Sequence, residues 1–183
     1  TAARAPDKTA IMDGDVRLTY SEFDAAVNRC AHALTARGLG RGDRLALISH
    51  NSWQFAVLNF ACARIGTILV PINFGLGVSE IAYILDHSGA SGIVAEDTLG
   101  ETVIEAISAA GTPVEIRGWI ALAGTQAPDG WEHVEEWMTA GDATPPDILV
   151  GDDEPVRMMY TSGTESRPKG VLLSSKSLMT QYV

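Results

Sequence analysis

The sequence is poor in several residue types that mark particular protein classes. It has two cysteines and four histidines among 183 residues, and aromatic residues make up 7%. Neither Cys30 nor Cys62 has a cysteine or histidine neighbour at the spacing of a metal site, so no metal cluster is predicted. Both lie in apolar helical patterns, which are typical of buried free thiols in a reducing cytosol. The scattered histidines indicate structural or surface roles.

Basic residues and long apolar runs are also scarce. The chain has 13 Lys and Arg against 23 Asp and Glu, a net charge of −10, which disfavours binding to nucleic acid or anionic lipid. Its most apolar stretch, residues 55–72, contains Asn59, Arg64, Gly66 and Pro71, which exclude a membrane span. No signal-peptide pattern is present. We therefore predict a cytoplasmic protein with no nucleic-acid partner and no transmembrane segment.

Short apolar runs alternate with helical patterns along most of the chain. This alternation predicts an α/β fold of βαβ units, in which helices flank a parallel sheet. The expected strands are residues 10–12, 16–20, 45–49, 68–72, 92–95, 114–120 and 157–160. The expected helices are residues 20–37, 53–65, 80–88, 101–110 and 131–138.

Capping residues support several of these boundaries. Thr19 and Glu22 have the spacing of a capping box, and Asn51 or Ser52 can cap the second helix. Ser79 is expected to cap the third helix. The first two strands flank Asp13-Gly14-Asp15, which favours a hairpin. We also expect three aromatic residues of the second helix to lie in the core, namely Trp53, Phe55 and Phe60.

The chain is predicted to have three parts. Residues 1–120 form a first α/β subdomain with an N-terminal hairpin, and residues 121–155 form a connection. Residues 156–183 comprise a strand, a loop and the start of a next strand or helix, as the beginning of a second subdomain. The acidic run 152–154 is interpreted as a solvated segment rather than a metal site.

The charge distribution singles out the last part. Residues 155–183 carry four basic side chains and one acidic side chain, whereas the rest of the chain is strongly acidic. A short basic segment in an acidic protein indicates a local anion site, although chance surface variation is an open alternative. The four basic residues are Arg157, Arg167, Lys169 and Lys176.

Residues 160–171 have the composition of a loop that binds a polyphosphate. Gly163 allows the backbone N–H groups to approach phosphate oxygens, and the hydroxyls of Thr161, Ser162 and Thr164 can donate hydrogen bonds. Lys169, between Pro168 and Gly170, supplies a positive charge for a leaving pyrophosphate. The segment is not a Walker A loop, because there the lysine follows a glycine and precedes Ser or Thr.

The segment Tyr160-Thr161-Ser162-Gly163-Thr164-Glu165-Ser166-Arg167-Pro168-Lys169-Gly170-Val171 resembles the phosphate-binding motif of the ANL superfamily of adenylate-forming enzymes. This superfamily comprises acyl-CoA synthetases, peptide-synthetase adenylation domains and luciferases. Residues 18–20, 42–47 and 66–85 are similar to it as well. Glu165 and Ser166 depart from the usual Thr-Gly of the motif, and Ser175 stands where many relatives have histidine.

The resemblance implies the front part of the large N-terminal domain of an acyl-CoA ligase. It implies ATP, Mg²⁺ and CoA as partners, together with a small carboxylic acid, expected to be a fatty acid. Lys169 would be catalytic, Thr161 would contact Mg²⁺, and the nucleotide would be bound by Thr161, Ser162, Gly163, Thr164, Glu165, Ser166 and Lys169. The later motifs of the family are missing from the sequence, so we expect the 183 residues alone to be inactive.

Two alternative functions stay open at this point. The enzyme could load a carrier protein instead of CoA, using the same first step. The chain could instead be an inert anion-binding module. Its assembly as a homodimer or a monomer is undetermined, as is the identity of the acid.

Overall fold

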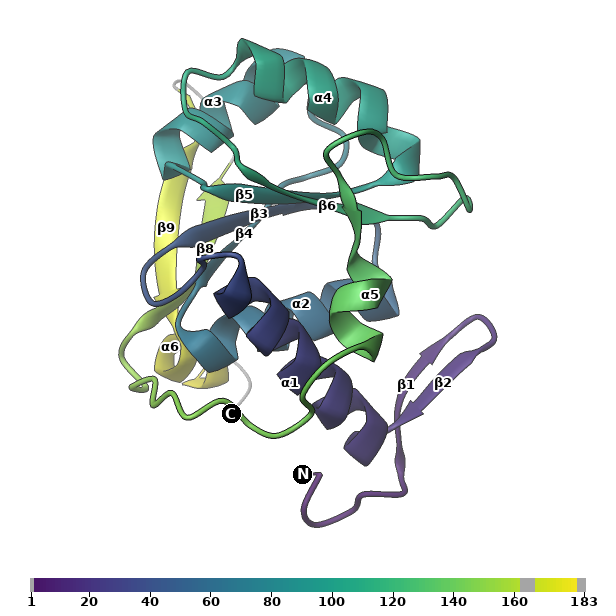
Figure 1. The fold of residues 1–183 in the computed structure, drawn as a ribbon. Coiled ribbons are helices and arrows are strands. Elements are labelled where there is room, and N and C mark those ends of the chain that lie inside the picture. Colours follow the sequence, from purple (N-terminus) through teal and green to yellow (C-terminus); the bar gives the residue numbers. More distant parts are fainter. Residues whose placement is uncertain (1, 162–166, 181–183) are drawn as a thin grey trace.

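The structure is a computed structural model that describes residues 2–161 and 167–180. These residues form a seven-stranded sheet in the order β7-β6-β5-β3-β4-β8-β9 and a separate two-stranded hairpin (Figure 1). The strands are β1 (Thr9–Asp13), β2 (Val16–Thr19), β3 (Arg44–Ile48), β4 (Ile68–Pro71), β5 (Gly92–Glu96), β6 (Ile116–Ile120), β7 (Glu132–His133), β8 (Pro155–Thr161) and β9 (Lys169–Ser174). The helices are α1 (Tyr20–Ala36), α2 (Trp53–Ile65), α3 (Val78–Ser88), the 3₁₀ turn η1 (Asp97–Leu99), α4 (Gly100–Ala109), α5 (Val134–Thr139) and α6 (Ser175–Thr180).

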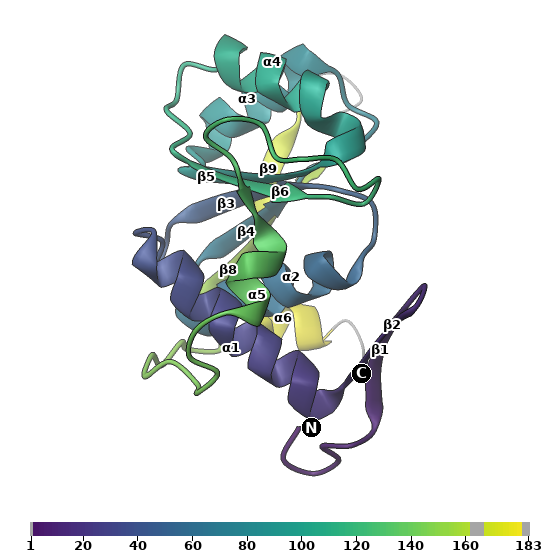
Figure 2. The ribbon, with the colours of Figure 1, turned by 45° about the vertical axis from the view of Figure 1, so that its right-hand side comes forward.

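The sheet separates two layers of helices, as the α/β prediction requires. Helices α3 and α4 cover one face, and α1, α2 and α5 cover the other (Figures 1 and 2). Neighbouring strands from β7 to β8 run parallel. Only β9, among the strands described, runs antiparallel within this sheet, because it is joined to β8 as a hairpin.

Side-chain caps fix the helix ends. The Thr19 hydroxyl accepts from the Glu22 N–H at 3.2 Å, and the Glu22 carboxylate accepts from the Thr19 N–H at 2.8 Å, so the predicted capping box is confirmed. Ser52 caps α2, and Gly66 ends it in the left-handed conformation at φ 75°. The prediction that Ser79 caps the third helix is wrong, because α3 begins earlier, after Gly77. The Gly77 N–H donates to the carboxylate of Glu80, in the first turn of α3.

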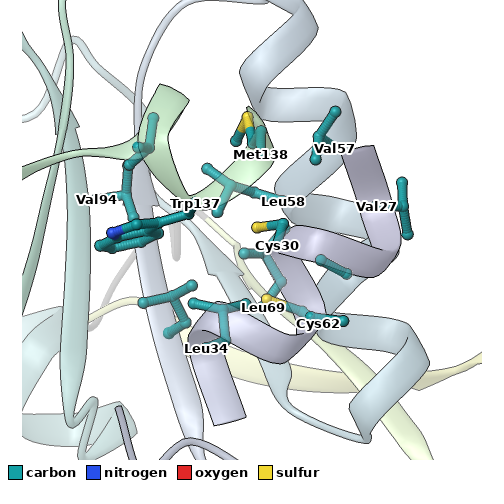
Figure 3. Packing of buried hydrophobic residues seen from close by; sticks show 14 of the residues in the cluster. Val27, Cys30, Leu34, Val57, Leu58, Cys62, Leu69, Val94, Trp137 and Met138 are labelled. Atoms are coloured by element: carbon teal, nitrogen blue, oxygen red, sulfur yellow. The ribbon is translucent and has the colours of Figure 1, made fainter. Parts of the chain in front are cut away.

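The core lies on both sides of the sheet. Between the sheet and helices α1, α2 and α5, the buried side chains include Leu34, Leu58, Trp137 and both cysteines (Figure 3). The prediction of buried free thiols is thus confirmed. Phe60 is a correction, because 53% of its surface is exposed. The buried stripe of α2 follows helical spacing through Gln54, Val57, Leu58, Ala61, Cys62 and Ile65, which leaves Phe60 on the other side.

One further boundary differs from the sequence prediction. Residues 132–133 form the short edge strand β7 beside β6, so α5 begins at Val134 rather than Trp131. In the acidic run 152–154, Asp152 and Asp153 are exposed, in agreement with the predicted solvated segment. Glu154 pairs with Arg41, and Asp153 lies 3.2 Å from the Lys176 ammonium.

The connection from α5 to β8 crosses the outer side of α1 (Figure 1). Asn28 donates to the Ala143 carbonyl at 2.8 Å, and a His32 ring nitrogen lies 3.0 Å from the Thr144 carbonyl. The connection carries the chain from one edge of the sheet to the other. Residues 155–174 thereby join the same sheet as residues 44–133, and the three-part division of the chain remains a prediction.

Candidate functional site

The candidate site lies where β8 ends and β9 begins. The register pairs Tyr160 with Gly170 and Thr161 with Lys169, so the last pair of the hairpin brings two predicted site residues opposite each other. Directly opposed residues in an antiparallel pair have Cβ atoms about 4.5–5.5 Å apart and point to the same face. Both side chains are exposed. The Thr161 hydroxyl and the Lys169 ammonium therefore lie at the two ends of the predicted phosphate-binding loop.

The other predicted ligands are in that segment. Ser162, Gly163, Thr164, Glu165 and Ser166 lie outside the described residues, so their roles stay predictions. The parallel order places the end of β8 at the carboxyl edge of the sheet, beside β4. In open α/β sheets ligands bind outside the carboxyl ends of the strands, so the position of Thr161 agrees with a binding role.

Gly170 is explained by its position opposite Tyr160. A Cβ at Gly170 would lie 3.1 Å from the Met158 sulfur and 3.2 Å from the Tyr160 ring. The missing side chain lets the tyrosine ring lie over the hairpin and face α3. Burial raises the pKa of Tyr160, and the neighbouring Tyr83 raises it further, so the phenol keeps its proton at neutral pH. The glycine after Lys169 therefore agrees with the family motif and is also required by the packing of Met158 and Tyr160.

The basic residues of the segment divide into two groups. Arg157 donates to the Asn59 side chain, and Lys176 contacts Asp153, so both have structural partners. Arg167 and Lys169 lie beside the predicted loop, and the Arg167 guanidinium is 5.3 Å from the centre of the Tyr83 ring. The positive charge predicted for an anion site is thus concentrated in the part of the chain that contains Lys169.

A second polar cluster lies at the same edge of the sheet, and the sequence did not predict it. Glu96, at the end of β5, accepts from the Ser49 hydroxyl at 3.1 Å and lies 2.7 Å from the His50 Nδ1. The Thr98 hydroxyl donates to the same carboxylate. His50 stacks on Phe74, with ring centres 4.0 Å apart.

A sequence signal for this cluster exists, because Ser49-His50 and Glu96 each terminate a buried apolar run. Carboxyl ends of neighbouring parallel strands meet at one edge. Strand β4 separates β3 from β8, so the usual strand spacing places the residues after β3 roughly 10 Å from the end of β8 and Glu96 on β5 roughly 14 Å from it.

The sequence model of the AMP-binding enzyme family matches residues 1–183. The chain belongs to this family. Among curated relatives of the chain, the long-chain-fatty-acid–CoA ligase FadD13 of Mycobacterium tuberculosis is 38% identical over 165 residues, covering 90% of the chain and 31% of the relative. A feruloyl-CoA synthase of an Amycolatopsis species is 37% identical over 177 residues, covering 97% and 32%. The chain thus spans about a third of the length of these relatives.

Solved structures confirm the architecture of this chain. The inhibitor-bound N-terminal domain of FACL13 from Mycobacterium tuberculosis superposes with a TM-score of 0.82 at 34% identity, covering 97% of the chain and 43% of that domain. The anthranilate–CoA ligase AuaEII superposes with a TM-score of 0.87 at 22% identity, covering 94% and 33%, which shows a shared fold. The predicted membership and the mainly parallel α/β fold are both confirmed.

Residues 2–161 and 167–180 include no helix with the length and apolar character needed to cross a membrane. The same residues contain no group of three His, Cys, Asp or Glu side chains placed to hold a metal ion. A Mg²⁺ ion that binds through substrate phosphates and water needs few protein ligands, and the exposed Thr161 hydroxyl at the end of β8 fits that requirement.

Proposed function

We propose that the protein containing this chain activates a carboxylic acid with ATP and transfers the acyl group to CoA. The observation that carries the proposal is the pairing of Thr161 with Lys169 at the carboxyl edge of the sheet, inside a motif that resembles a phosphate-binding loop. Membership of the AMP-binding family supports it. The names of the ligase relatives support an acyl-CoA product.

The proposed reaction has two steps. A carboxylate oxygen attacks the α-phosphorus of ATP, pyrophosphate leaves, and an acyl-adenylate forms. A thiolate sulfur then attacks the acyl carbon, and AMP leaves with the electrons of the broken C–O bond. Negative charge grows on the β- and γ-phosphates in the first step, so donors fixed in advance lower its barrier.

The residues of the chain have distinct roles in this proposal. The Lys169 ammonium stabilises the charge on the departing pyrophosphate, and the Thr161 hydroxyl contacts the phosphates and Mg²⁺. The metal ion, when bound, neutralises charge on the phosphate oxygens. Ser162, Gly163, Thr164, Glu165 and Ser166 complete the loop. A cytoplasmic location and a homodimer also remain predictions.

The test is pyrophosphate exchange by the full-length protein. Labelled pyrophosphate should enter ATP when long-chain fatty acids or aromatic acids such as ferulate are offered, since relatives bear both names. Lys169→Ala should lower the exchange rate by about 10²–10³, the usual effect of removing one transition-state donor. Lys176→Ala is the matched control, because Lys176 contacts Asp153 in the same segment. Equal effects of the two substitutions would exclude the role given to Lys169.

A carrier-protein acceptor is the second candidate. One relative, 37% identical over 176 residues, is named a fatty acid–[acyl-carrier-protein] ligase, ScoC of Streptomyces coeruleorubidus. Thioester formation with CoA and with a phosphopantetheinylated carrier protein should be compared at equal thiol concentration. Preference for the carrier protein would favour this candidate, and no exchange with any acid would favour an inert anion-binding module.

A further inference from the structure

Helix α3 presents two side chains to the β8–β9 hairpin. Tyr83 and His87 are four residues apart, so they lie on one face of the helix. The Tyr83 hydroxyl donates to the Pro168 carbonyl at 3.0 Å. The His87 Nδ1 shares a hydrogen bond of 2.8 Å with the Tyr160 hydroxyl. One turn of one helix therefore contacts β8 at Tyr160 and the residue that directly precedes β9, Pro168.

The contacted residues are adjacent to the proposed phosphate ligands. Tyr160 directly precedes Thr161 on β8, and Pro168 directly precedes Lys169 on β9. The register ends at the Thr161–Lys169 pair, so the Pro168 carbonyl lies where the ladder stops. A buried or half-buried carbonyl at such an end needs a donor, and Tyr83 provides one.

Ring packing restricts the same side chains. The Tyr83 and His87 rings have centres 5.4 Å apart, and the His87 and Tyr160 rings meet edge to face at 5.6 Å. The Arg167 guanidinium lies on the Tyr83 ring. Aromatic and cation–π contacts each add to the hydrogen bonds, so the hairpin is held to α3 by several contacts at once.

We propose that Tyr83 and His87 are positioning residues, which hold the two ends of the phosphate-binding loop and thereby aim Thr161 and Lys169. This proposal rests on the proposed function. Alternation along the strands turns Thr161 and Lys169 to the face opposite Tyr160. The α3 contacts therefore fix the backbone of the hairpin without occupying the side on which the phosphates would bind.

Tyr83→Phe is the decisive variant, because it removes only the hydroxyl that donates to Pro168. In the full-length protein we expect kcat for pyrophosphate exchange to fall about three- to tenfold, the usual consequence of losing one hydrogen bond. The KM for the acid should stay unchanged. Tyr20→Phe is the control, since Tyr20 lies at the start of α1, away from the β8–β9 hairpin.

Trypsin provides a readout that is independent of activity. Cleavage after Lys169, identified by mass spectrometry under native conditions, should be at least threefold faster in Tyr83→Phe than in the wild type or in Tyr20→Phe. His87→Leu should behave like Tyr83→Phe. His87→Asn should restore slow cleavage and exchange, because its amide oxygen can replace Nδ1 as the partner of Tyr160.

The outcomes separate the two proposals. The positioning role is overturned if Tyr83→Phe has the same cleavage rate and the same kcat as Tyr20→Phe. It is also overturned if Tyr83→Phe raises the KM for the acid and leaves kcat unchanged. A wild type that lacks exchange, with faster cleavage in Tyr83→Phe, overturns the proposed function and supports the hold of α3 on the hairpin.

Discussion

Glu96 is a carboxylate whose side chain is only 1% exposed, and it is surrounded by hydrogen-bond donors. Burial raises the pKa of Glu96, but hydrogen bonds from Thr98, His50 and Ser49 outweigh this effect and leave the pKa below its ordinary value. The charged form is therefore favoured in the folded protein. This residue joins the carboxyl ends of β3 and β5.

Replacing Glu96 by Gln should lower the free energy of unfolding by about 1–3 kcal/mol at pH 7, because an amide N–H group would face other donors. A carboxylate with a depressed pKa stabilises the fold above its ordinary pKa, about 4.3, and this contribution is lost as the pH falls through the lowered value. Urea unfolding at pH 7 and at pH 4 should show the difference between wild type and variant shrinking in acid.

Glu101→Gln is the control for that measurement, since Glu101 is an exposed residue of α4. It should change stability by less than about 0.5 kcal/mol at either pH. A Glu96→Gln variant as stable as this control at pH 7 would contradict the assignment of Glu96 as a buried, charged acceptor.

At the scale of elements, α5 packs directly onto β6 at Gly118. A Cβ there would lie 2.7 Å from the Trp137 ring, 2.8 Å from Val134 and 2.9 Å from Val94. These three side chains are buried, so they have little room to move. The close approach of this helix to the sheet depends on the absence of a side chain.

Gly118→Ala should therefore destabilise the protein by about 1–3 kcal/mol through overpacking. For a chain of this size that corresponds to a fall in the thermal midpoint of roughly 3–10 °C. Gly40→Ala is the matched control, because the nearest atom to its added Cβ is the Asp43 carboxylate at 3.9 Å. Equal thermal midpoints for the two variants would contradict this account of the α5–β6 contact.

Elements with strong local signals were predictable from the sequence. The bounds of α2 and the capping box of α1 agree with the prediction, because hydrophobic period and capping chemistry act within one helix. The sequence did not predict strand β7, because two residues are too few to show a hydrophobic period and the strand is defined by its pairing with β6. The prediction of a buried Phe60 is wrong, because the helical period of α2 turns this aromatic side chain away from the core.

The candidate site was predictable only where a continuous motif carries it. Thr161 and Lys169 come from one segment and meet across one hairpin. His50 and Glu96 are 46 residues apart, and Tyr83 and Pro168 are 85 residues apart. Such pairs become neighbours through the order of strands in the sheet, which no local pattern specifies.

At the scale of the whole molecule, the reactivity of the two cysteine thiols reports how often the core becomes exposed to solvent. Cys30 and Cys62 are fully buried between α1 and α2 (Figure 3). Burial raises the pKa of the Cys30 thiol to about 12 and that of Cys62 well above its ordinary value. Thiolates react and thiols do not, so both groups should be inert in the folded protein.

Neither thiol should be labelled by iodoacetamide at pH 8 within the time that labels a free cysteine completely. Labelling should reach completion in denaturing urea, and its urea midpoint should match that of helix loss by circular dichroism. Mass spectrometry after a timed quench provides the measurement. Rapid labelling of Cys30 or Cys62 without urea would show that the α1–α2 layer opens separately from the rest.

The strand order has a consequence for the time at which the hairpin can form. Strand β8 docks on β4, and the chain that joins them passes through β5, β6, β7 and the whole crossing over α1. Pairings between segments so distant in sequence form slowly, because loop closure must precede them. During synthesis the chain leaves the ribosome N-terminus first, so strands β3 to β7 can pair before residues 155–174 emerge. The segment that carries the proposed phosphate site is then added to a finished edge, and an interrupted synthesis should yield the five-stranded scaffold without that segment.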